Sequence, residues 1–175
     1  MRLRLRKVED ALHVRDAVQS DASGKDGVMT GKADFTDEEW DLLREGPAAA
    51  GMMVVVADKG GTFRETFAMA KAYGEARNHH GESELLDELV AAGPKRGSRY
   101  HSPEELHEQG LQRLRQAADL LAKKATPNDL QDYSAFVVTL AKKVADAHRE
   151  HGQQVSEREQ GAIRDIEASL SGPSA

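Results

Sequence analysis

The stretch from Ala48 to Asp58 reads AAAGMMVVVAD and is apolar on every side when it is wound into a helix. A helix that is hydrophobic all round is buried on every side within its protein. We therefore expect this segment to lie at the centre of an all-α bundle, with the other helices packed around it. The apolar run from Ala48 to Ala57 has about half of the ~20 residues that a bilayer span requires, so we expect no membrane insertion.

A second interpretation of this region is a nucleotide-binding βα unit. Residues 52–67, MMVVVADKGGTFRETF, also fit a β-strand, a glycine turn and a helix, and the amides of Gly60 and Gly61 would then face a phosphate. However, neither GxGxxG nor GxxxxGK followed by Ser or Thr occurs in the chain. A parallel sheet also needs several such strands, and the chain offers one. The helical interpretation is therefore favoured.

The strongest helix start is FTDEEW, residues 35–40. Thr36 is placed to cap the helix, and Glu39, three residues later, can accept a hydrogen bond from the amide of the cap. Phe35 and Trp40 have the spacing of a hydrophobic staple. Gly46 and Pro47 predict that this helix ends and that the next one begins, since Pro suits a first helical turn and disfavours helix in the residue before it.

Further amphipathic segments follow along the chain. We predict helices within 62–80, over 84–92, from a cap at Ser102 to about Ala125, from a cap at Thr126 to Gly152, and after a cap at Ser156. The fold class is thus an all-α bundle of six or seven helices, with a single helical domain at 35–172. Residues 1–34 are expected to form a weakly ordered, flexible N-terminal arm, because much of this stretch is small and polar. In it, the alternation of Leu3, Leu5 and Val8 fits either a short strand or a first helical turn, and Met29 is an alternative start of translation.

The amino-acid composition disfavours several classes of fold and ligand. Hydrophobic residues make up 39% and aromatic residues 5% of the 175, which disfavours a β-sandwich or barrel. The net charge of -6 would repel a polyanion, so nucleic acid is not expected as the main ligand. With no Cys, the chain has neither disulfides nor thiolate ligands. Charges interrupt the stretch after MRLRLRK, where a signal peptide would be apolar, and we expect a cytoplasmic protein.

Histidines and a carboxylate form a candidate transition-metal site. His148 and His151 are three residues apart and share a helix face, as metal ligands do. Glu104 and His107 match the carboxylate and histidine pair that di-iron bundles place on one helix. A competing interpretation is that His148 and His151 complement the dipole at a helix C-terminus. A di-iron site also needs a second such pair, which is absent from the chain.

The basic stretch 95–101 is a candidate anion-binding loop. Lys95, Arg96, Arg99 and Tyr100 concentrate positive charge and hydrogen-bond donors in an otherwise acidic chain. The alternative is a solvated connection between two helices. Sequence motifs of nucleophilic catalysis such as GxSxG do not occur, so no catalytic residues are predicted and the chain is not expected to be an enzyme.

Residues 35–58 and 144–170 resemble a family of small uncharacterised bacterial helical proteins, which are loosely similar to tellurite-resistance B-like helical domains. The positions that carry this resemblance are Phe35, Thr36, Glu38, Glu39, Trp40, Pro47, Gly51, Asp58, Val155, Ser156 and Glu159. The resemblance implies an all-helical fold and no assigned catalytic residues. Tellurite-resistance B domains are associated with acidic metal-binding positions and membrane-linked stress complexes, but the turn at residues 151–154 reads HGQQ and lacks acidic residues here.

Two functions are therefore expected. The first is a non-enzymatic protein-interaction or stress-associated module, which acts through another protein or through self-association. The alternative is a metal-binding protein, enzyme or sensor, built on His148, His151, His107 and Glu104.

Overall fold

The computed structural model describes residues 30–57, 63–77, 83–95, 100–149 and 155–171. These residues form one 3-10 turn and six α-helices: η1 (Lys32–Asp34), α1 (Asp37–Ala57), α2 (Phe63–Ala76), α3 (Glu84–Ala92), α4 (Pro103–Lys124), α5 (Pro127–Arg149) and α6 (Glu157–Leu170). The described segments contain no strand, and the prediction of an all-α bundle is confirmed.

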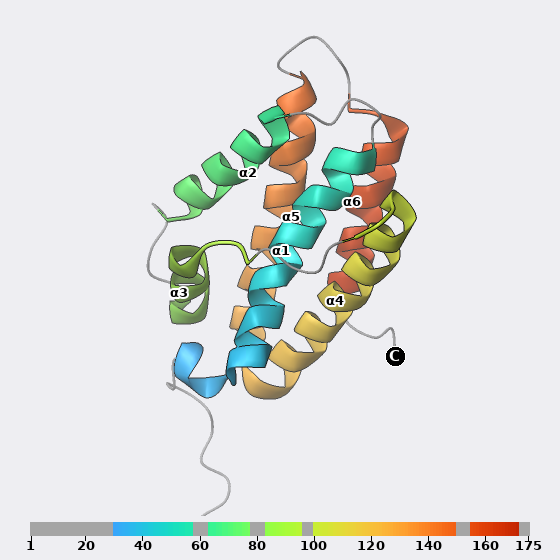
Figure 1. Ribbon diagram of the computed structural model, residues 1–175. Coiled ribbons are helices and arrows are strands. Elements are labelled where there is room, and N and C mark those ends of the chain that lie inside the picture. The colour runs from blue at the N-terminus through green and yellow to red at the C-terminus, as the bar shows by residue number, and fades with distance from the viewer. Residues whose placement is uncertain (1–29, 58–62, 78–82, 96–99, 150–154, 172–175) are drawn as a thin grey trace, which may run out of the picture.

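Helix α1 runs through the middle of the bundle (Figure 1). It packs against α4, α5 and α6, while α2 lies along α5, and α3 contacts α5 and η1 at one edge. The predicted central position of the valine-rich segment is thus confirmed. The βα interpretation is wrong, because Val54, Val55 and Val56 belong to α1; Gly60 and Gly61 lie outside the described residues.

The predicted helix end at Gly46 and Pro47 is also wrong, since α1 continues through both residues. Pro47 has no amide proton, so the Leu43 carbonyl four residues earlier loses its helical donor. The hydroxyl of Tyr133, on α5, donates a hydrogen bond of 3.0 Å to this carbonyl. The helix continues because a side chain from another helix replaces the missing donor.

A second correction concerns how completely α1 is buried. Neighbouring helices bury the face that carries Ala50, Met53 and Val54. Met52 and Val56 instead remain 44% and 39% exposed. The segment is therefore central but not enclosed on every side, because the helices packed on it leave part of its circumference uncovered.

The predicted caps form as expected. Thr36 donates its amide to a Glu39 carboxylate oxygen at 2.8 Å and accepts from the Glu39 amide at 3.2 Å. The rings of Phe35 and Trp40 pack with centroids 6.2 Å apart. The same reciprocal pair of hydrogen bonds joins Ser156 and Glu159 at the start of α6, so local sequence sets where these helices begin.

Part of the predicted arm is described. Residues 1–29 lie outside the described part of the chain, whereas Thr30 is buried and residues 32–34 form η1. The amide of Lys32 donates to a carboxylate oxygen of Glu88 on α3, at 2.5 Å. The start of the described chain is therefore attached to α3.

Candidate functional site

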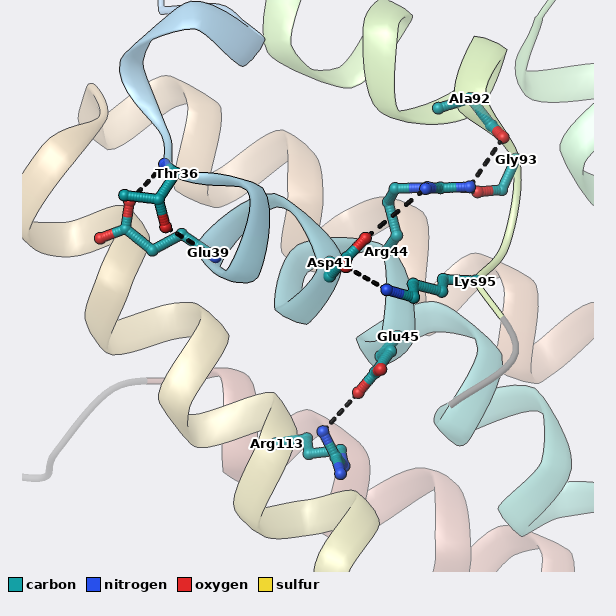
Figure 2. A network of polar contacts seen from close by, with 9 residues as sticks. All are labelled: Thr36, Glu39, Asp41, Arg44, Glu45, Ala92, Gly93, Lys95 and Arg113. Carbon is teal, nitrogen blue, oxygen red and sulfur yellow. Dashed lines mark hydrogen bonds and ion pairs between the residues drawn. The ribbon is translucent and has the colours of Figure 1, made fainter. Parts of the chain in front are cut away.

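Three acidic side chains of α1 each bind a cation from another element, and Figure 2 shows two of these pairs, Asp41 with Lys95 and Glu45 with Arg113. Glu39 pairs with Lys124 of α4 at 2.6 Å. Asp41 pairs with Lys95, in the connection that follows α3, and Glu45, one turn after Asp41, pairs with Arg113 of α4. The hydrogen bond from Lys124, followed by the one from the Thr36 amide, lowers the pKa of Glu39. These pairs fasten α4 and the connection after α3 to α1.

Of the four residues of the predicted anion-binding loop, the structure describes two. Lys95 already has Asp41 as its anionic partner. Tyr100 is half-buried and packs against the hydrophobic core. Arg96 and Arg99 lie outside the described residues. The structure therefore gives Lys95 and Tyr100 contacts within the bundle, and anion binding by the four residues together stays a prediction.

Two arginines that the sequence did not single out hold the C-terminal end of α3. Arg44 of α1 donates to the carbonyls of Gly93 and Ala92, each at 3.1 Å (Figure 2). Arg77, just after α2, donates to the carbonyls of Val90 and Ala91 at 3.2 and 3.3 Å. The last carbonyls of a helix have no intrahelical donors, and here two guanidinium groups supply them. No sequence signal marks this role, because the acceptors are backbone atoms of a distant segment.

The predicted metal ligands are not brought together within the described residues. His107, on α4, lies 3.2 Å from Asp165 of α6, measured from Nε2 to Oδ2, and Glu104 is exposed on α4. His148 lies in the last turn of α5, with its side chain outside the description, and His151 is not described. Over the described ranges, no group of three or more His, Asp or Glu residues could hold a metal ion. For His107, the structure shows a contact with Asp165 that the sequence did not predict.

A buried carboxylate joins three elements at the other end of α5. Asp129 is 6% exposed, and one of its oxygens accepts from the Thr126 amide at 3.1 Å and from the Thr126 hydroxyl at 2.7 Å. Its other oxygen accepts from the hydroxyl of Ser83, the cap of α3, at 2.8 Å. Burial alone would raise the pKa of Asp129, but the hydrogen bonds from Thr126, Ser83 and Thr30 lower it. The sequence predicted the cap at Thr126 and missed the contacts with Ser83 and Thr30.

Apolar grooves flank the exposed face of α5. One, of about 320 Å³, lies between α2, α3 and α5, and its lining includes Ala76, Leu86 and Phe136. Phe136 also packs edge to face against Tyr73, with ring centroids 5.2 Å apart. The other groove, of about 480 Å³, lies between α5 and α6 and includes Leu130, Val138 and Leu170.

Comparison with protein families, with curated proteins and with solved structures found no match to this chain. The resemblance to tellurite-resistance B-like domains therefore stays a prediction. Within the described residues, each helix is either too short or too polar to cross a bilayer.

The polar contacts of α1 and α3 described above are contacts within the bundle. The acidic side chains of α1, and Arg44 and Arg77 at the C-terminal end of α3, make contacts that hold helices together. Among the described residues, Met52 and Val56 on α1 are large apolar side chains that are exposed, and apolar side chains also line the two grooves beside α5.

Proposed function

We propose that this chain is a non-enzymatic helical module of the cytoplasm that acts through protein contacts, and that its exposed apolar face on α1 pairs with the same face of a second copy. The observation that supports this is the exposure of Met52 and Val56, which lie one helical turn apart on the central helix. Methionine is common on adaptable binding surfaces because its side chain is flexible and polarisable.

Charge favours a second copy as the partner. The whole chain carries a net charge of -6, so two copies repel each other over most of their surface. The second half of α1, from Gly46 to Ala57, contains no charged residue, and two such faces meet without like-charge contacts. In a dimer with a two-fold axis, the same patch of each copy contacts its counterpart, so the patch must be complementary to itself. An uncharged apolar patch meets this condition. Two exposed side chains from each copy bury little surface, so we expect a dissociation constant of roughly micromolar or weaker.

The stress-associated role rests on the resemblance described above. It is compatible with a module that works by association and adds no residue to the site.

Sedimentation velocity over a range of concentrations tests this proposal. We expect the chain to shift from monomer to dimer as its concentration rises, and the double variant Met52→Lys with Val56→Lys to remain monomeric, because four lysines would face one another in the pair. Gln112→Lys, at an exposed position of α4, adds charge elsewhere and should leave the association unchanged. A wild-type chain that is monomeric at every concentration, or a double variant that dimerises as the wild type does, would overturn the proposal.

A further inference from the structure

The methionines in the described part of the chain differ in how far their side chains are enclosed. Met53, on α1, is 2% exposed, and its Sδ lies 2.6 Å from the position that a Cβ atom on Gly110 of α4 would take. Met69, on α2, is half-buried and packs against the hydrophobic core. Its Sδ lies 3.6 Å from the corresponding position on Gly51. Met52 lies on the uncovered side of α1 and is 44% exposed, so solvent reaches it more freely than the other two.

An exposed methionine thioether reacts with hydrogen peroxide to give a sulfoxide. The sulfur atom donates an electron pair to one peroxide oxygen, so that an S–O bond forms and the O–O bond breaks. The sulfur is oxidised by two electrons, and the other oxygen takes up the proton of the transferred oxygen and leaves as water. Because the chain contains no Cys, thiol oxidation does not compete with this reaction. Among the described methionines, we expect Met52 to react first.

A sulfoxide at Met52 changes the face of α1 that is proposed above to pair. Oxidation converts an apolar side chain into a polar one that accepts hydrogen bonds. Residues 46–57 of α1 contain no side chain that donates a hydrogen bond. In the pair, the sulfoxide oxygens of both copies would therefore leave water for a contact that offers them no donor. Burying a polar group without a hydrogen-bond partner is unfavourable, so oxidation opposes the pairing.

We propose that Met52 is a site of reversible oxidation by peroxides and that its sulfoxide dissociates the pair of α1 faces. This inference rests on the proposed function, because it concerns the regulation of the same surface. The oxidant reaches Met52 in the monomer, which the weak affinity expected for the pair keeps available. A methionine sulfoxide reductase restores the thioether and with it the apolar face.

Peptide mapping by mass spectrometry after brief treatment with hydrogen peroxide tests which methionine reacts. Met52 and Met53 fall in one tryptic peptide, residues 45–59, and fragmentation between them assigns the added oxygen. We expect the sulfoxide to form about tenfold faster at Met52 than at the buried Met53, and faster than at Met69. Equal rates at Met52 and Met53 would overturn the proposal.

Sedimentation velocity before and after oxidation measures the effect on association. For the wild type, we expect the dissociation constant to rise by about tenfold or more with peroxide, and to return after treatment with sulfoxide reductases. Met52→Leu has no thioether at this position, so its dissociation constant, whatever its value before treatment, should not respond to peroxide. Met69→Leu is the matched control and should respond as the wild type does. Circular dichroism should show the same helix content before and after oxidation.

The outcomes separate this proposal from the pairing on which it rests. An untreated wild type that is monomeric at every concentration would overturn the pairing and its regulation together. An untreated dimer that persists after Met52 is oxidised would leave the pairing in place and overturn the regulation alone. Peroxide-induced dissociation of Met52→Leu, or a loss of helix content in the oxidised wild type, would assign the effect to another cause and would also overturn the regulation.

Discussion

Gly46 lies so close to Tyr133 that a Cβ atom on Gly46 would overlap the tyrosine hydroxyl. The absence of a side chain at Gly46 lets that hydroxyl reach the backbone of α1 and donate to the carbonyl of Leu43. The next residue, Pro47, is the one that deprives this carbonyl of its helical donor. A glycine, a proline and a tyrosine from α5 thus act together to carry α1 through a sequence that would otherwise end a helix.

We expect Tyr133→Phe to lower the free energy of unfolding by about 1–3 kcal/mol, because it leaves a buried carbonyl without a donor. In a Pro47→Ala background, the new amide at position 47 supplies the helical donor, so the same change should cost less. Urea denaturation of the two single variants and the double variant measures the difference. Equal losses in both backgrounds would show that the hydroxyl does not replace the amide missing at Pro47.

Gly46→Ala should destabilise the protein, although alanine is normally the better helix former, because its methyl group would overlap the Tyr133 hydroxyl. Removing that hydroxyl with Tyr133→Phe should reduce the loss caused by Gly46→Ala. Gly74→Ala is the matched control, since a Cβ atom there meets nothing within 4 Å, and it should stabilise the chain by about 1 kcal/mol. Thermal or urea unfolding measures whether Gly46→Ala lowers and Gly74→Ala raises the free energy of unfolding. A stabilising Gly46→Ala would contradict the close contact with Tyr133.

Asp129→Asn should lower stability near pH 7 by about 1–3 kcal/mol, because the amide cannot accept all the hydrogen bonds that the carboxylate accepts from Thr126 and Ser83. The folded pKa of Asp129 lies below its unfolded value of about 3.9. The carboxylate therefore contributes stability above that pH, and the contribution is lost as the pH falls through the folded pKa.

Urea unfolding between pH 7 and pH 3 measures this dependence. The difference in stability between the wild type and Asp129→Asn should narrow as the pH falls below about 4. Asp119→Asn, on the exposed side of α4, is the control for a general loss of one charge. Stability curves for Asp129→Asn and the wild type that stay parallel down to pH 3 would contradict the assignment.

Arg77→Ala should loosen α3, because the carbonyls of Val90 and Ala91 lose their guanidinium donor. Water can replace the donor at this surface, so the expected loss is about 1 kcal/mol. Hydrogen exchange followed by mass spectrometry should show faster exchange in a peptide covering α3, and Arg44→Ala should have a similar effect. Arg115→Ala on α4 is the control. Unchanged hydrogen exchange of α3 in both the Arg77→Ala and the Arg44→Ala variants would show that these arginines do not stabilise the end of α3.

Metal binding separates the proposed module from the alternative of a metalloprotein. For protein purified without a polyhistidine tag, we expect substoichiometric transition metal and no shift of the melting temperature on adding zinc, iron or manganese. A ligand of the native state raises stability by mass action, so a true site would raise the melting temperature. If it did, His107→Ala and His151→Ala would show whether the predicted ligands are responsible.

Much of the helical layout follows from short-range patterns in the sequence. The helix starts at Thr36, Ser102 and Ser156 form as predicted, because a cap and its partner lie within four residues of each other. The apolar face of α5 was also visible in the spacing of Tyr133, Val137, Leu140 and Val144, all of which are buried.

Long-range contacts account for what the sequence alone could not show. Gly46 and Pro47 have the local signature of a helix end. The helix continues because Tyr133, 86 residues after Pro47, supplies a donor to the Leu43 carbonyl. The pairing of His107 with Asp165 and of Ser83 with Asp129 likewise joins segments that no periodicity relates.

The amino-acid sequence by itself determined the helical class, most helix boundaries and the apolar face of α5, because these depend on hydrogen bonds and periodicities that close within a few residues. Tertiary structure decided that α1 is one helix, that part of it is exposed, and that Arg44 and Arg77 donate to the last carbonyls of α3. Those outcomes depend on which distant donors, acceptors and apolar surfaces meet when the helices pack.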